Sequence, residues 1–400
     1  MAFPQLPIYC DCNATTPIDP LVLDAMLPYF GERFGNPSSS SHIYGWTAQA
    51  AVERARTTIA SAINADPSEI VFTSGATEAN NLAIKGIAET SLPIGRHIIT
   101  IATEHNAVLA PLRYLETLGF EVTILPVQPN GLLNIGKLKK ALRKDTILVS
   151  VMAANNEIGV LQPLEKIAAL LMDSQKELGR KIPFHTDAAQ ALGKIPLDVE
   201  ALGLDLVSLT AHKLYGPKGV GALYIRRRNP RITLAPQLHG GEQERDLRSG
   251  TLNPPLIIGF AKAVELGLAR MHEDTAKLII LRDLLWETLS EQLPDIELNG
   301  STSPRLANNL NVSIAGVNSS ALMLGIRNTV AVSTGSACSS ANPKPSHVLT
   351  ALGRSPSLAQ ASLRFGLGRE MTVEDIDAIA SCVVSTVHAL RKNSISSSPT

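Results

Sequence analysis

Short apolar segments alternate with amphipathic segments along the chain from about residue 60 to residue 225. The apolar segments are rich in Ile, Val and Leu and have the length of β-strands, whereas the segments between them place apolar residues at helical spacing. Apolar strands separated by helices are typical of a largely parallel sheet with helices on both faces. We therefore predict an α/β fold, with strands at 69–75, 96–103, 120–127, 146–154, 182–190, 204–213 and 219–226.

The pattern changes after residue 255, which indicates a second and smaller α+β unit. A long helical stretch at 256–293 is followed by strand-like residues at 307–316 and a terminal helix near 373–392. A chain of 400 residues suits about two domains. We predict a large domain over 16–260, a small domain formed by 1–15 and 261–392, and a Ser-rich disordered tail at 393–400.

Charge and composition exclude several classes of protein. Lys plus Arg and Asp plus Glu both number 36, so nothing indicates binding to nucleic acid or to an anionic membrane. No apolar run approaches the roughly 20 residues of a membrane-spanning helix, and the N-terminus does not resemble a signal peptide. Four cysteines in the whole chain do not make a disulfide framework. We expect a soluble, cytoplasmic protein.

Polar residues follow the predicted strands, where open α/β sheets bind their ligands. Ser74-Gly75 precedes a helix start at Thr77, whose free N–H groups suit a phosphate, although a plain capped turn has the same pattern. Asp187 could pair with a protonated ring nitrogen or could cap a turn. Lys213 follows a buried strand, where desolvation would prepare it for Schiff-base formation, although most lysines are solvated surface residues.

A phosphate cradle, an Asp and then a Lys form, in this order, the set that pyridoxal 5′-phosphate (PLP) requires. His105 follows another predicted strand and could stack on the cofactor ring, or could cap a helix.

Several long motifs resemble the cysteine desulfurases, which are fold-type I PLP enzymes related to the class V aminotransferases. They extend from residue 13 to residue 369, and the GSAC sequence at 335–338 resembles group I of that family. The motifs are NATTPIDP, FGNPSSSSH, IVFTSGATEANNLAIKG, TEHNAVL, NNEIGV, HTDAAQALGK, HKLYGPKGVGALY, HGGEQERDLRSGT, STGSACSS and SLRFGLGR.

The resemblance implies a role for each matching residue. Lys213 would bind the cofactor covalently, Asp187 would pair with its ring nitrogen, Gln190 with its phenolic oxygen, and His105 would stack on the ring and act in catalysis. Arg364 would grip the substrate carboxylate, and Asn156 would contact substrate or cofactor. The residues expected around the phosphate are Ala76, Thr77, Thr210 and His212, together with Thr251 from the neighbouring subunit of a homodimer.

The implied activity is removal of sulfur from L-cysteine. Cys338 lies among Ser, Thr, Gly and Ala, and a polar site suits a reactive thiolate better than an apolar one. It would take up the sulfur as a persulfide while alanine is released. The sulfur would then pass to an acceptor such as an iron–sulfur scaffold, to other sulfur-containing cofactors or to thiolated tRNA.

Two other functions fit the same residues. A cystine or cysteine β-lyase or a selenocysteine lyase could use this fold, and Cys338 would then be dispensable for turnover. A sulfur-relay subunit that works mainly by binding partners is the alternative of another class, but it has no reason to retain Lys213, Asp187 and His105 together.

Four features depart from these motifs or lie outside them. Thr210-Ala211 stands where the family usually has Ser-Gly, and we still expect cofactor binding. Cys10 and Cys12 are expected to pack in the interior rather than to bind metal, and Cys382 to lie in the core. The run 226–228 of three arginines is expected to be a solvated strand end, or else part of a docking surface for an acidic partner.

Overall fold

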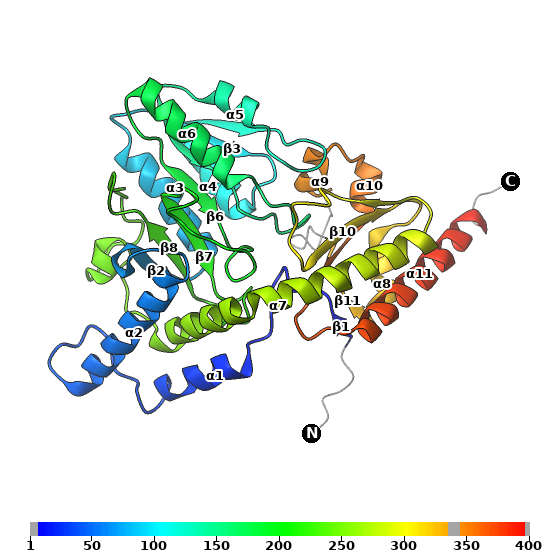
Figure 1. Cartoon of the computed structure of the whole chain (residues 1–400), viewed down its shortest axis with the longest axis horizontal. Helices are drawn as coiled ribbons and strands as arrows, with labels where there is room; N and C mark the ends of the chain where they lie inside the picture. The colour runs from blue at the N-terminus through cyan, green and yellow to red at the C-terminus, as the bar shows by residue number, and fades with distance from the viewer. Residues whose placement is uncertain (1–6, 335–344, 397–400) are drawn as a thin grey trace.

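The computed structural model describes residues 7–334 and 345–396, with side chains up to residue 393. Figure 1 shows a sheet covered by helices on one side of the molecule and a smaller unit on the other. A single long helix, α7 (Pro254–Gln292), runs through both parts. No helix of the described residues is long and apolar enough to cross a membrane.

The large sheet has seven strands within the described residues, in the order β2-β8-β7-β6-β5-β3-β4. Pairing is parallel from β7 to β4, and β8 is antiparallel to both of its neighbours. Because β2 and β7 are both antiparallel to β8, they run in the same direction. The carboxyl end of β2 therefore lies at the same edge of the sheet as that of β7. The strands are β2 (Ile70–Thr73), β3 (His97–Ile101), β4 (Glu121–Leu125), β5 (Thr146–Ser150), β6 (Phe184–Asp187), β7 (Leu206–Thr210) and β8 (Gly221–Ile225).

Both faces of this sheet are buried, as the apolar strands predict. Ile70 and Phe72 of β2 pack into a core on one face, and Val71 packs into the core on the other face. Helices α3 and α4 cover the face of Val71, and α2, α6 and the first half of α7 cover the opposite face. The remaining helices of this part are α1 (Pro20–Met26), α2 (Ile43–Ser61), α3 (Ala76–Thr90), α4 (Asn106–Thr117), α5 (Ile135–Ala141) and α6 (Leu164–Leu178), with 3₁₀ turns at Leu27–Tyr29, Pro67–Glu69 and Gln243–Asp246.

The smaller unit is built on an antiparallel sheet of order β12-β10-β9. Its core is formed with α8, α11 and the second half of α7, where Leu281, Leu285 and Leu289 are buried. A parallel pair of β1 and β11 adjoins it. The elements are β1 (Ile8–Tyr9), β9 (Ile296–Leu298), β10 (Asn309–Ile314), α8 (Ser319–Ile326), β11 (Val330–Ala331), α9 (His347–Ala351), α10 (Pro356–Gln360), β12 (Ser362–Gly366) and α11 (Val373–Ser396).

Three features refine the sequence-based expectations. Residue 260, the expected domain boundary, lies inside α7, and α11 continues to Ser396 rather than ending near 392. The prediction of a solvated arginine run is wrong for Arg226, which is 5% exposed and pairs with Asp205 and Glu200. Arg227 is half-buried and Arg228 is exposed. Arg226 is buried because the residue that follows β8 pairs with the loop before β7. The spacing of residues in the sequence does not reveal this pairing.

The cysteines of the described residues are free thiols. Cys10 and Cys12 are buried, which confirms the packing expected for them, and burial raises the pKa of the Cys12 thiol to about 11. Cys382 is only partly buried, against the core of the smaller unit.

Candidate active site

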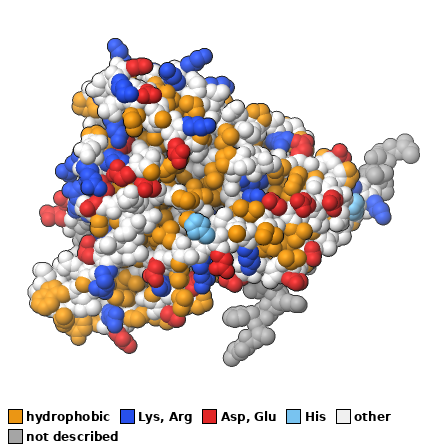
Figure 2. Space-filling view, viewed as in Figure 1, with side chains coloured by type: hydrophobic (Ala, Val, Ile, Leu, Met, Phe, Trp, Pro, Cys, Tyr) orange, Lys and Arg blue, Asp and Glu red, His pale blue; other side chains and the backbone are white. Residues whose placement is uncertain are grey.

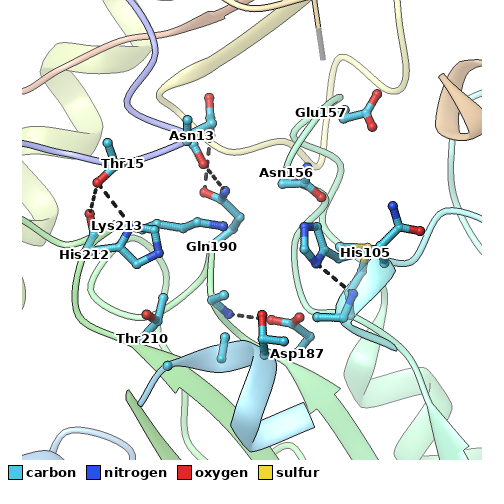
Figure 3. Close-up of a pocket in the computed structure, with 18 of the residues that line it drawn as sticks. Asn13, Thr15, His105, Asn156, Glu157, Asp187, Gln190, Thr210, His212 and Lys213 are labelled. Atoms are coloured by element: carbon cyan, nitrogen blue, oxygen red, sulfur yellow. Dashed lines mark hydrogen bonds between the residues drawn. The ribbon is translucent and has the colours of Figure 1, made fainter. Parts of the chain in front are cut away.

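A pocket of about 870 Å³ lies at the carboxyl edge of the large sheet, where the polar segments were predicted to meet. Its walls come from the segments after β2, β3, β5, β6 and β7, from the N-terminal segment at Asn13 to Thr15, and from β12 of the smaller unit. Figure 3 shows the labelled side chains directed into one space, with Lys213 reaching across from the loop after β7 toward Gln190.

Lys213 is partly buried and lines the pocket, and desolvation there lowers its pKa below the ordinary value for lysine. Nearby Arg364 lowers it further, whereas Asp187 acts in the opposite direction. No hydrogen bond or ion pair to its ammonium group occurs within the described residues. An amine whose pKa is lowered and that has no such partner is suited to nucleophilic and acid–base chemistry.

Asp187 ends β6 and is held rigidly at the floor of the pocket, with 5% of its surface exposed. Its Oδ1 accepts the N–H of Ala189 at 2.9 Å, and its Oδ2 accepts from Nδ2 of Asn80 at 2.7 Å. Each carboxylate oxygen retains a lone pair, so the group can also accept from a protonated heterocycle in the pocket.

An anion site lies at the start of α3. Gly75 has a φ of 151°, a conformation that side chains rarely adopt, and it leads directly into the helix at Ala76. The first N–H groups of α3 have no partner within the helix and lie at the positive end of its dipole. Thr210 and His212 line the same end of the pocket, where burial lowers the pKa of His212 to about 4. His212 is therefore neutral and binds Thr15 Oγ1 through Nδ1 at 3.1 Å.

His105 caps α4 and also lines the pocket. The N–H of Ala107 donates to its Nδ1 at 3.0 Å, so any proton of the neutral ring is on Nε2. Burial lowers the pKa of His105, so the ring is neutral near physiological pH. His105 therefore caps a helix, as one of the two alternatives predicted, and it also lines the pocket, while its stacking on a cofactor ring stays a prediction.

Arg364 lies on β12 with 3% of its surface exposed. Its NH1 donates to the carbonyl oxygen of Asn156 at 3.0 Å, and its NH2 pairs with Asp11 Oδ1 at 2.6 Å. Its Nε is buried without a partner. The guanidinium is thus held in position at the wall of the pocket, which suits it to an incoming carboxylate.

The structure brings together most of the residues that the sequence singles out. The pocket is lined by Ala76, Thr77, His105, Asn156, Asp187, Gln190, Thr210, His212, Lys213 and Arg364. Thr251 is exposed before α7 and does not line it. Cys338 lies outside the described residues.

Four further residues support the site, and sequence reasoning assigned a role to none of them, although Glu157 lies in the NNEIGV motif. Asp11 holds Arg364, Asn13 and Lys194 hold Gln190, and Glu157 accepts a hydrogen bond from Ser346 at the rim. The four-residue spacing of Gln190 and Lys194 was the one pattern in the sequence that could have indicated such a contact. The other contacts join segments more than 170 residues apart.

The residues present fit PLP. The unpartnered amine of Lys213 can bond its aldehyde carbon, Asp187 retains acceptor capacity for the ring nitrogen, and Gly75 opens the start of α3 to the phosphate. Ala211, buried beside Thr210, is absent from the residues with positive φ, so this position does not require glycine.

Fold and pocket together define the class: an α/β enzyme that binds PLP at the carboxyl edge of its large sheet. The aminotransferase class-V family model matches residues 8–379. The chain belongs to this family, and its curated relatives there are cysteine desulfurases. The cysteine desulfurase IscS of Neisseria gonorrhoeae is 50% identical over 97% of this chain and 94% of its own length.

Solved structures agree with this assignment. A NifS-like protein superposes with a TM-score of 0.88 at 36% identity and covers 96% of this chain and 100% of its own. The structure titled SspA in complex with cysteine has a TM-score of 0.78 at 38% identity, covering 91% of this chain and 100% of its own.

Proposed function

We propose that this protein acts as an L-cysteine desulfurase through the pocket described above, with Lys213 as the central catalytic residue. The observation that carries the proposal is the placement of an unpartnered amine of lowered pKa together with Asp187, His105 and Arg364 around one space. Homology to cysteine desulfurases along nearly the whole chain, and a structural neighbour titled as a complex with cysteine, support L-cysteine as the substrate.

PLP, when bound, supplies an electron sink for the Cα of the substrate. Arg364, backed by Asp11, binds the substrate carboxylate and so directs Cα toward Lys213. The Lys213 amine, whose pKa burial lowers, removes the Cα proton. His105, neutral and protonated on Nε2, would lie beside the ring and can donate a hydrogen bond inside the pocket.

Sulfur transfer is assigned to Cys338. Its thiolate attacks the sulfur of the substrate, so that an S–S bond forms while the C–S bond breaks, and the electron pair remains on the substrate carbon. That carbon takes up a proton, and the products are alanine and a persulfide on Cys338.

A paired assay of the wild type and Cys338→Ala tests this assignment. We expect the variant to bind PLP and L-cysteine but to release neither alanine nor protein-bound persulfide. Wild-type turnover by the variant would contradict the desulfurase mechanism. Pyruvate as the product would then point to the β-lyase alternative.

A homodimer is the second part of the proposal. Large apolar side chains are exposed from α1 to the start of α2, among them Phe30 (61%) and Phe34 (65%) in the segment between the 3₁₀ turn and α2. Figure 2 shows apolar side chains gathered at the lower left, where these helices lie. A second copy of the chain would cover this surface and bring its Thr251 to the phosphate end of the pocket.

The destination of the sulfur follows from the family. The similarity to cysteine desulfurases named IscS supports a role as a supplier of sulfur, and we propose iron–sulfur clusters as its destination. We propose that the acceptor is a scaffold protein in the cytoplasm. This acceptor would be tested by the transfer of labelled sulfur from the Cys338 persulfide to a purified scaffold protein, with Cys338→Ala as the control.

A further inference from the structure

Lys194 lies one turn after Gln190 in the segment that follows β6. Hydrogen bonds from Leu192 N to Ala188 O (3.2 Å) and from Lys194 N to Ala191 O (3.0 Å) wind this segment as helical turns. Residues four apart therefore share one side of it. Gly193 has a φ of 67°, and a Cβ there would lie 2.5 Å from Leu214 Cδ1, so the turn packs directly behind Lys213.

The side-chain amide of Gln190 has its orientation determined by the backbone carbonyl of Asn13, and Lys194 completes it. Nζ of Lys194 donates to Oε1 at 3.1 Å, and burial lowers the pKa of this amine to about 7. The backbone carbonyl of Asn13 can only accept, and Nε2 of Gln190 donates to it at 2.7 Å. The oxygen of the amide therefore faces Lys194, and the nitrogen faces Asn13.

A second chain of amides leads to the same oxygen. Nδ2 of Asn309 donates to the carbonyl of Glu157 at 3.2 Å and to Oδ1 of Asn13 at 3.1 Å. This leaves Nδ2 of Asn13 to donate to Oε1 of Gln190 at 3.3 Å. Two donors thus fill the lone pairs of Oε1, and the second N–H of Nε2 has no partner within the described part of the chain. Figure 3 shows Gln190 between Asn13 and the end of Lys213.

We propose that Lys194 is a positioning residue that orients and polarises Gln190, so that its remaining N–H is the donor offered to the ring oxygen of PLP. The inference rests on the proposed function. Lys194 does not line the pocket; it borders a separate cavity of about 40 Å³ behind Lys213 and so acts through Gln190. A hydrogen bond to the amide oxygen strengthens the N–H as a donor in a buried site, and the effect is largest below pH 7, where Lys194, whose pKa burial lowers to about 7, carries its charge.

The test is the pH midpoint of the visible absorbance of bound PLP in the full-length holoenzyme. When the ring oxygen of PLP loses its hydrogen-bond donor, the negative charge on that oxygen is less well stabilised. PLP then keeps its proton to a higher pH, so the pH midpoint of the absorbance rises. We expect Gln190→Ala to raise it by about one pH unit and Lys194→Met by roughly half as much. Lys194→Arg, which keeps a cationic donor, should remain near the wild type. Lys166→Met, at an exposed position on α6, controls for loss of a lysine elsewhere.

Lys194→Met in the Gln190→Ala background should cause no further shift, because the residue through which it acts is missing. An equal shift in both backgrounds, or no shift in the single Lys194 variants, overturns the inference. Lys194→Gln serves as a second variant if Lys194→Met does not fold. An unshifted Gln190→Ala would likewise overturn the inference, whereas a wild type without PLP on Lys213 would contradict the proposed function itself.

Discussion

At the scale of single residues, hydrogen-bond and ion-pair partners hold the functional side chains of the site in place and leave them able to bind a ligand. Asp11 and the Asn156 carbonyl occupy two nitrogens of Arg364 and leave its Nε free. Asn80 and the N–H of Ala189 hold Asp187 without neutralising it. Lys213 is left without such a partner, which keeps its amine available.

Arg364→Lys tests the carboxylate site. A lysine keeps the charge but loses the planar fork, so we expect the KM for L-cysteine to rise about 10- to 100-fold with a smaller change in kcat. Steady-state kinetics would measure this, with Arg327→Lys, exposed after α8, as the matched control. A fall in kcat at unchanged KM would contradict the role of Arg364 in substrate binding.

At the scale of elements, the central strands carry buried polar groups that are satisfied between neighbours. His185 on β6 binds Ser150 Oγ of β5 through Nδ1 at 2.8 Å and Ser208 Oγ of β7 through Nε2 at 3.1 Å. Burial lowers its pKa from 6.5 to about 4. The imidazole is therefore neutral in the folded protein and links three strands directly beneath the site.

This histidine predicts a loss of stability in acid. Between pH 6.5 and 4 the unfolded chain binds a proton on His185 and the folded chain does not, so the free energy of unfolding falls as the pH falls. The contribution is on the order of 3 kcal/mol. Urea unfolding across this range should show a shallower decline for His185→Asn than for the wild type. His388→Asn, exposed on α11, should decline as the wild type does, and an equally steep decline of both variants would refute the prediction.

At the scale of the whole molecule, two cores are joined by one helix and meet at the site. Phe260 of α7 packs into the core of the large sheet, and Leu285 packs into the core of the smaller unit. Arg364 of the smaller unit thereby faces Lys213 of the larger one across the pocket. Relative motion of the two parts would change the distance between substrate-binding and proton-transfer groups.

Phe30→Glu tests the proposed dimer surface. A charge in a buried apolar interface is unfavourable, so we expect the variant to sediment as a monomer and to lose most of its activity together with the partner's Thr251. Met172→Glu, at a similarly exposed apolar position on α6, should leave mass and activity unchanged. A Phe30→Glu variant that keeps the wild-type mass would place the interface elsewhere.

The α/β class and the polar edge of the sheet could be predicted from the sequence, as could Lys213, Asp187, His105 and Arg364 as candidate site residues, because strand periodicity and contiguous motifs are local properties. The groups that orient these residues became known from the packed structure. The contacts of Asn13 with Gln190 and of Asp11 with Arg364 span 177 and 353 residues, and the burial of Arg226 depends on strand pairing. Hydrogen-bond direction and desolvation arise only when distant segments pack together, so no local pattern encodes them.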